Sequence, residues 1–297
     1  MKDTVPTGKT HDAPTVSRRE FTVLSVAAGV AAATGMESSA AALDVSLSDV
    51  EIRTPDGTCD AALAQPRGNG HWPAVVMFPD AFGLRPTVRE MARRLAANGY
   101  TVLVPNPFYR LTKAPGIDPG FDFQSPDDRA KLTSLRAPLT NNAVGQDARS
   151  LIAHLDGLKV VNTRKKVGVV GYCMGGLMTM QASAGASNRI GAAASFHGGG
   201  LVTDSAESAH LLVPKMKAEY YFGVAANDDE RQPDAKTRLA DAFGAAHLVA
   251  RIEVYDATLH GWCMKDMPSS GGKPVYNEPQ AERAWGELLA LYRRVLA

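Results

Sequence analysis

Beyond residue 43, the spacing of apolar residues alternates between a period of two, typical of strands, and one near 3.6, typical of helices. This alternation indicates β-α-β units, and no linker rich in Ser, Pro or Gly interrupts it. We therefore predict a single α/β domain whose mostly parallel sheet carries helices on both faces. Strands are expected at residues 50–53, 58–64, 73–79, 101–105, 166–170, 190–196, 218–225 and 248–255. Helices are expected at residues 87–98, 142–158, 177–184, 234–246 and 278–296.

The first 42 residues differ from the rest in composition. Residues 17–21 read Ser-Arg-Arg-Glu-Phe, residues 23–33 are weakly apolar, and residues 40–42 are all Ala. The apolar run is too short to span a bilayer, which takes about 20 residues. This layout resembles a twin-arginine export signal, which implies the export machinery as a partner, a periplasmic or secreted mature chain of residues 43–297, and no stable membrane span after cleavage. The alternative is a disordered basic arm with an apolar anchor.

Composition and charge argue against several classes of protein function. Of 297 residues 45% are apolar, and 32 Lys and Arg balance 31 Asp and Glu to a net charge of +1. This balance disfavours disorder and a nucleic-acid-binding surface. Three cysteines are too few for a disulfide scaffold, and the absence of Cys-x-x-Cys pairs or Cys/His clusters in the sequence predicts no metal site. After export, a disulfide between Cys59 and Cys263 would still be allowed.

A nucleophile elbow stands between the buried strand at 166–170 and the following helix. Residues 171–176 read Gly-Tyr-Cys-Met-Gly-Gly, the pattern Gly-x-nucleophile-x-Gly with Cys173 at its centre. Glycines two positions either side remove collisions at a tight turn, and the helix N-terminus favours a thiolate. The N–H of Met174 would then point to a substrate oxyanion. The alternative is that Cys173 is a buried small residue in a glycine-rich turn.

The order of residues after the nucleophile selects its partners, because in this architecture an acid and then a histidine follow it in loops after strands. His260 follows the strand at 248–255, and its position makes it the predicted base. Asp228 and Asp229 both follow the strand at 218–225. We favour Asp228 as the acid because it is nearer the strand end, and Asp229 remains the alternative.

Several aromatic side chains fall at or beyond the carboxyl ends of predicted strands, where ligands bind in open α/β sheets. Packing in the core is an equally good interpretation of each. His197 also ends a strand there, with substrate contact or a structural hydrogen bond as its two possible roles. The aromatic residues are Phe82, Phe108, Tyr109, Phe196 and Trp262.

The chain from residue 74 to residue 296 resembles the dienelactone hydrolases, cysteine-dependent members of the α/β-hydrolase fold. The resemblance rests on residues 170–176, supported by Phe-Pro-Asp-Ala-Phe-Gly at 78–83, Asn-Gly-Tyr at 98–100, His-Gly-Trp at 260–262 and Tyr-Asn-Glu at 276–278. It implies Cys173 as nucleophile, Asp228 as acid, His260 as base, and the N–H of Ala81 as second oxyanion donor. No metal or organic cofactor is implied.

Two positions depart from the pattern that this resemblance implies. Asp80 stands where the family carries a glutamate that contacts the resting nucleophile. Met264, with Lys265 next to it, stands where one of the family's arginines would bind a substrate carboxylate, and Arg129 or Arg136 could supply the other such contact. The expected reaction is hydrolysis of a small ester or lactone of the dienelactone type through a thioester. A broad carboxylesterase or thioesterase and a non-catalytic exported binding protein are the alternatives.

Overall fold

The computed structural model describes residues 42–297 except residue 119. The predicted export signal, residues 1–42, therefore lies almost wholly outside the described residues. From Ala42 to Ala297 the chain forms one compact unit. Within these described residues no helix is both long and apolar enough to cross a membrane.

Eight strands form one sheet in the order β1-β2-β4-β3-β5-β6-β7-β8. β1 pairs antiparallel with β2, and β2 with β4, while every pairing from β4 to β8 is parallel. This confirms the predicted mostly parallel sheet. The strands are β1 (Val45–Thr54), β2 (Gly57–Pro66), β3 (Ala74–Phe78), β4 (Thr101–Pro105), β5 (Val167–Tyr172), β6 (Ile190–Phe196), β7 (Glu219–Ala225) and β8 (Ala250–Tyr255).

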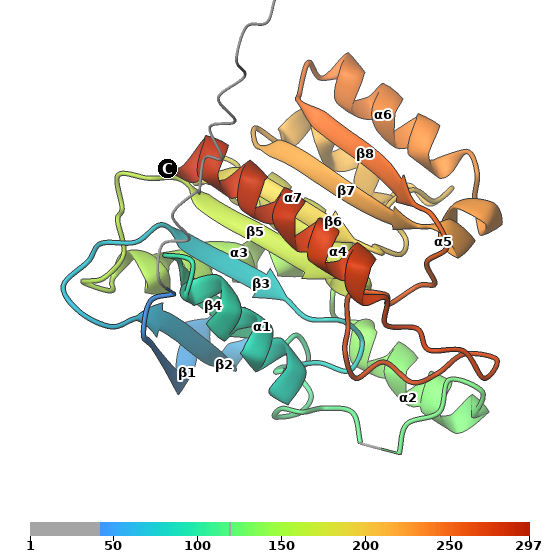
Figure 1. Cartoon of the computed structure of the whole chain (residues 1–297), viewed down its shortest axis with the longest axis horizontal. Coiled ribbons are helices and arrows are strands. Elements are labelled where there is room, and N and C mark those ends of the chain that lie inside the picture. Colours follow the sequence, from blue (N-terminus) through green and yellow to red (C-terminus); the bar gives the residue numbers. More distant parts are fainter. Residues whose placement is uncertain (1–41, 119) are drawn as a thin grey trace, which may run out of the picture. The chain divides into compact units, whose positions relative to one another are not determined.

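Helices cover both faces of the sheet, as Figure 1 shows with α1 and α7 in front and α3 and α4 behind. Neighbouring residues of one strand point to opposite faces. Val75 packs in the layer with α1 and α7, whereas Val76 packs in the layer with α3 and α4. The helices are α1 (Pro86–Ala96), α2 (Pro126–Arg136), α3 (Asn141–Asp156), α4 (Met174–Gly185), α5 (Ala226–Arg231), α6 (Ala235–Ala245) and α7 (Glu278–Leu296), with a 3₁₀ helix, η1 (Ala209–Lys215).

The sequence pattern missed two helices, α2 and α5. α2 has no strong apolar stripe, since only Leu132 and Leu135 are buried, but its beginning carries an N-cap signal. The Ser125 side chain accepts a hydrogen bond from the Asp128 N–H, and Pro126 follows the cap. α5 is a single short helix that the sequence presented as an acidic turn.

The disulfide considered possible between Cys59 and Cys263 is not formed in this structure, in which both thiols are free and buried. The Cys59 thiol donates to the carbonyl oxygen of Asn106, with 3.6 Å between sulfur and oxygen. Cys263 instead packs in the layer with α1 and α7. The two sulfur atoms therefore lie in different parts of the domain.

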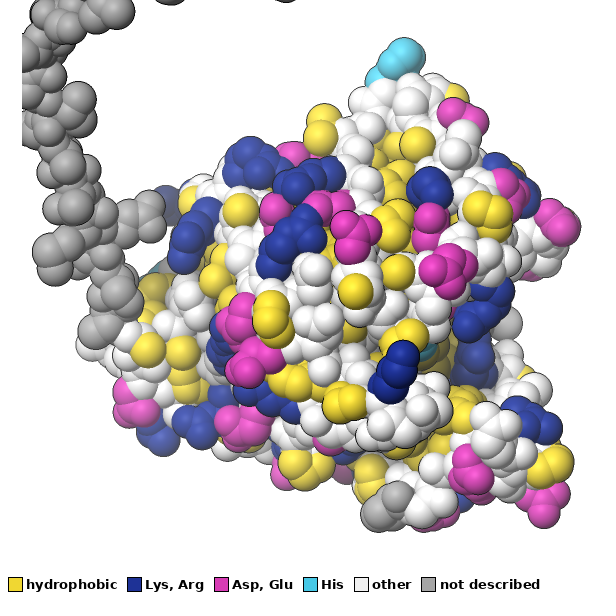
Figure 2. Space-filling model, turned by 45° about the vertical axis from the view of Figure 1, so that its right-hand side comes forward, with side chains coloured by type: hydrophobic (Ala, Val, Ile, Leu, Met, Phe, Trp, Pro, Cys, Tyr) yellow, Lys and Arg dark blue, Asp and Glu magenta, His cyan; other side chains and the backbone are white. Residues whose placement is uncertain are grey.

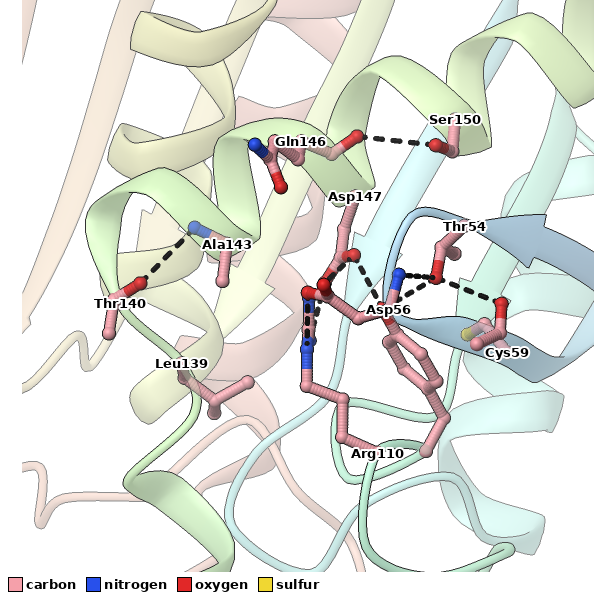
Figure 3. A network of polar contacts seen from close by, with 12 residues as sticks. Thr54, Asp56, Cys59, Arg110, Leu139, Thr140, Ala143, Gln146, Asp147 and Ser150 are labelled. Atoms are coloured by element: carbon pink, nitrogen blue, oxygen red, sulfur yellow. Dashed lines mark hydrogen bonds and ion pairs between the residues drawn. The ribbon is translucent and has the colours of Figure 1, made fainter.

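A polar network anchors the long segment after β4 to the rest of the domain (Figure 3). Arg110 forms ion pairs with Asp56, in the β1–β2 turn, at 2.7 Å and with Asp147 of α3 at 2.9 Å. Tyr109 donates to Asp147 at 2.7 Å. These contacts fix the beginning of a segment, residues 106–125, that reaches the candidate site.

Acidic and basic side chains are interspersed over the face of the molecule in Figure 2, with hydrophobic side chains scattered between them. A nucleic-acid-binding surface would instead gather Lys and Arg on one face. The visible face therefore agrees with the nearly balanced net charge.

Candidate active site

Cys173 lies at the tip of the turn between β5 and α4, in a left-handed conformation with φ of 54°. The flanking glycines are required by close approach of the backbone. A Cβ added to Gly171 would collide with the carbonyl oxygen of Gly175, and one added to Gly175 would collide with that of Phe78. The structure thus supports the steric reason for the predicted elbow, and it leaves the Cys173 side chain partly exposed at a cavity.

His260 and Asp228 lie together as the order of the chain predicts. Nδ1 of His260 is 2.6 Å from Oδ2 of Asp228. The backbone N–H of His260 donates to Oδ1 of Asn227 at 2.9 Å, which fixes the histidine loop against the beginning of α5. Asp229, the alternative acid, pairs instead with Lys236, and each of its oxygens lies 2.7 Å from Nζ.

The electrostatic surroundings of His260 favour its protonated ring. Burial lowers the pKa of His260, but the hydrogen bond that its ring donates to Asp228 and the interaction with Cys173 outweigh burial and raise this pKa to about 10. Because Nδ1 faces Asp228, the remaining nitrogen, Nε2, is the one available to Cys173 or to a substrate. The ring and the sulfur line the same cavity.

His197 and Trp262 do not line this cavity, and both are fully buried. Nδ1 of His197 accepts a hydrogen bond from the Cys173 N–H at 3.1 Å. The His197 ring packs edge-on against His260 and against Trp262, with centroids 5.2 Å and 5.1 Å apart. Of the two roles considered for His197, the structure therefore shows the structural hydrogen bond. Trp262 packs against the His197 ring.

Asp80 lines the cavity but is only 1% exposed. Its two oxygens lie 2.6 Å and 3.0 Å from the guanidinium of Arg85, and the Phe82 N–H donates to one of them at 3.0 Å. Burial raises the pKa of Asp80, although Arg85 and Phe82 oppose this shift. Arg85 also pairs with Asp266 at 2.7 Å, so it joins the loop after β3 to the loop after His260. The carboxylate of Asp80 is thus directed to Arg85.

The two predicted oxyanion donors occupy suitable elements. Met174 is the first residue of α4, so its N–H has no acceptor within the helix. Ala81 follows Asp80 in the loop after β3 and lines the cavity beside Cys173. Among the described residues, no group of three or more His, Cys, Asp or Glu side chains could hold a metal ion.

The cavity has a volume of about 470 Å³. Three phenylalanines line it, of which Phe82 was expected from the sequence and two from residues 106–125 were missed. The missed pair, Phe121 and Phe123, sits in a stretch without apolar period, so no pattern in the sequence pointed to these rings. Phe108 and Phe196 are core residues, each 1% exposed.

The side chains considered for binding a substrate carboxylate lie outside the cavity at Cys173. Met264 is fully buried, and Lys265 and Arg136 line other cavities. Arg129 donates to the carbonyl oxygens of Phe123 and Gln124, both at 3.0 Å. None of these four residues lines the cavity at Cys173.

Comparison with known proteins places this architecture in a family. The model of the dienelactone hydrolase family matches residues 59–296. A candidate carboxymethylenebutenolidase from Synechocystis sp. is 27% identical, over 79% of this chain and 91% of the relative. Carboxymethylenebutenolidase 1 from Cupriavidus pinatubonensis is 28% identical, over 67% of this chain and 80% of the relative.

Solved structures agree on the fold. A candidate dienelactone hydrolase from Klebsiella pneumoniae superposes with a TM-score of 0.71 at 22% identity, covering 84% of this chain and 99% of that protein. The family model extends over most of the chain and includes the elbow, the acid loop and the histidine loop. The chain therefore belongs to the dienelactone hydrolase family and is a carboxylic ester hydrolase.

Proposed function

We propose that this protein hydrolyses a small ester or lactone through Cys173, His260 and Asp228, with a thioester intermediate. The observation that carries the proposal is the 2.6 Å contact between His260 and Asp228 at a cavity that the Cys173 sulfur also lines. A nucleophile, a base and a group that orients the base are the parts that acyl transfer by a thiol requires. The match to a family of ester hydrolases supports the same reaction class.

In the first half of the reaction the Cys173 thiolate attacks the carbonyl carbon of the substrate. The N–H groups of Met174 and Ala81 stabilise the oxyanion that forms. As the carbon–oxygen bond breaks, Nε2 of His260 gives its proton to the departing alkoxide, which leaves a thioester on Cys173. For a lactone the alkoxide stays attached to the acyl group.

In the second half a water molecule gives a proton to Nε2 of His260 and attacks the thioester, and Cys173 leaves as thiolate. This step needs a neutral imidazole. The interaction with Cys173 is one of the causes of the raised pKa of His260. Acylation converts the thiolate into an uncharged thioester and so removes this cause. The pKa of His260 therefore falls when the thioester forms, which prepares the ring to act as a base.

The experiment compares hydrolysis of 4-nitrophenyl acetate and of a carboxylated dienelactone by the protein and by Cys173→Ala. We expect Cys173→Ala to abolish hydrolysis and His260→Ala to accumulate an acetyl group on Cys173, visible by peptide mass spectrometry. Cys59→Ala is the matched control, because burial raises the pKa of that thiol to about 12 and it lies away from the cavity. Undiminished turnover by Cys173→Ala would refute the proposal, and an unreactive Cys173 would favour a binding protein.

We also propose that residues 1–42 direct export by the twin-arginine route. Support comes from the paired arginines, the weakly apolar run and the small-residue end of this segment. A reporter fused to residues 1–42 should reach the periplasm. Replacing Arg18 and Arg19 together with Lys should block this export, whereas Lys9→Gln should not. Export that survives the paired replacement would contradict the twin-arginine route.

A further inference from the structure

Three phenylalanine rings form one corner of the cavity at Cys173. Phe82 lies in the loop after β3, whereas Phe121 and Phe123 lie before α2. The ring centroids are 5.8 Å apart for Phe82 and Phe121, 5.5 Å for Phe82 and Phe123, and 4.8 Å for Phe121 and Phe123. All three pairs meet edge to face, the arrangement that aromatic rings prefer. We call Phe82, Phe121 and Phe123 the aromatic corner.

The backbone of the aromatic corner is held in place by polar contacts. The guanidinium of Arg129 donates to the carbonyl oxygens of Phe123 and Gln124, and the Asp122 N–H donates to Asp128 at 2.9 Å. At the other end of the segment, Arg110 and Asp147 form the ion pair drawn in Figure 3. These contacts hold the backbone at residues 122–124, on either side of Phe123.

Phe123 is 43% exposed although it is a large apolar side chain. It lines the cavity together with Phe82 and Phe121, whose rings it contacts. Exposed apolar surface gathered in a concave site marks a place where a ligand binds. The ligand group that complements such a corner is a flat apolar ring.

The two cations that line the cavity, Arg231 and the protonated His260, both contact Asp228. Asp80 is paired with Arg85, and Asp122 is exposed at the cavity without a recorded ion pair among the described residues. Arg231 also lines the cavity, but its guanidinium lies 3.2 Å from Oδ1 of Asp228. A substrate carboxylate would compete with Asp228 for Arg231 and be repelled by Asp122.

We propose that this site selects uncharged esters that carry an aromatic ring and discriminates against esters that carry a carboxylate. This proposal rests on the proposed function, because Cys173 must first be the nucleophile. The aromatic corner takes the ring of the substrate, and the carbonyl carbon lies at Cys173.

The experiment measures kcat/KM for two matched series of esters in a pH-stat. One series has the ring on the acyl side: methyl phenylacetate and methyl 4-carboxyphenylacetate. The other has it on the alcohol side: benzyl acetate and 4-carboxybenzyl acetate. Methyl butyrate, without ring or charge, is the reference. In at least one series we expect the uncharged aryl ester to be preferred over its carboxylated partner by roughly tenfold or more.

The variants Phe121→Ala and Phe123→Ala should lower kcat/KM for the preferred aryl ester roughly tenfold and leave methyl butyrate nearly unchanged. Leu211→Ala is the matched control, because Leu211 is 52% exposed and lies outside the cavity. Preference for the carboxylated esters, or an equal effect of the variants on aryl and butyrate esters, would overturn the proposal. Failure of the proposed function is distinguishable, since then no ester, methyl butyrate included, would depend on Cys173.

Discussion

The backbone N–H of Cys173 donates a hydrogen bond to Nδ1 of His197, with 3.1 Å between the two nitrogens. His197 must therefore carry its proton on Nε2. Burial, with a smaller effect of nearby His260, holds the pKa of His197 well below its ordinary value. A neutral imidazole thus accepts from the strained residue at the tip of the elbow. This acceptor helps to fix the left-handed conformation that presents the sulfur.

Replacing His197 with Phe should destabilise the elbow, because Phe keeps the ring but removes one of the two acceptors of the Cys173 N–H, which also donates to the carbonyl oxygen of Phe196 at 3.1 Å. We expect a loss of about 0.5–1.5 kcal/mol in the free energy of unfolding, measured in urea. The rate of Cys173 alkylation should also fall. His154→Phe, in the last turn of α3, is the control for introducing a phenyl ring. Equal stability of the two variants would show that the bond to His197 contributes nothing.

The titration of His260 should depend on the state of Cys173. NMR of the ring nitrogens should place its pKa near 10 in the untreated protein. Alkylation of Cys173 with iodoacetamide removes the thiolate, so this pKa should fall, and Asp228→Asn should lower it further. The Cys59→Ala protein, treated in the same way, controls for reaction elsewhere. A His260 pKa that does not respond to alkylation would mean that the sulfur and the ring do not interact.

The raised pKa of His260 also predicts how the free energy of unfolding changes with pH. The folded-state pKa of His260 is raised from 6.5 to about 10, so the protonated ring contributes stability that is complete below about pH 6.5. This contribution is lost as the pH rises through about 10. Between neutral and alkaline pH, the free energy of unfolding measured in urea should fall less for Asp228→Asn than for the unmodified protein. An equal loss in both would contradict the assignment of this pKa to the contact with Asp228.

The sequence was most informative where backbone geometry restricts the choice of residue. Gly171 and Gly175 identified the elbow because no side chain fits at those positions. The chain order of partners then led to His260 and Asp228, because the carboxyl ends of parallel strands meet at one sheet edge. The central strand β3, which is buried throughout, was likewise predicted from an unbroken apolar run.

Tertiary contacts without a local signature could not be read from the sequence. Phe121 and Phe123 lie in an aperiodic loop, and nothing local indicates that they meet Phe82, which follows a different strand. The pairing of Arg85, which also holds Asp80, with Asp266 joins segments 181 positions apart in the chain. The family resemblance placed Asp80 where a glutamate would contact the nucleophile, but it gave no sign of the ion pair with Arg85 that occupies this carboxylate.

Arg85→Met should be strongly destabilising, because it leaves the buried carboxylate of Asp80 without its ionic partner. Breaking a buried pair in this way costs about 3–5 kcal/mol in the free energy of unfolding. Arg89→Met is the matched control, since Arg89 pairs with Asp49, whose side chain is 78% exposed, and should cost less than about 1 kcal/mol. Urea denaturation measures both. Similar costs for the two arginines would refute the structural role of Arg85.

The neighbouring carboxylates Asp228 and Asp229 should differ sharply in their effect on hydrolysis. Asp228→Asn keeps the shape of the side chain but removes the negative charge that orients His260 and favours its protonated form. We therefore expect kcat to fall by roughly 100-fold or more. Asp229→Asn breaks only the ion pair with Lys236, a contact between side chains 21% and 40% exposed, and should leave kcat within about twofold. Initial rates with methyl butyrate, checked against urea stability, separate lost catalysis from lost folding. A larger fall for Asp229→Asn than for Asp228→Asn would exchange the roles of the two residues.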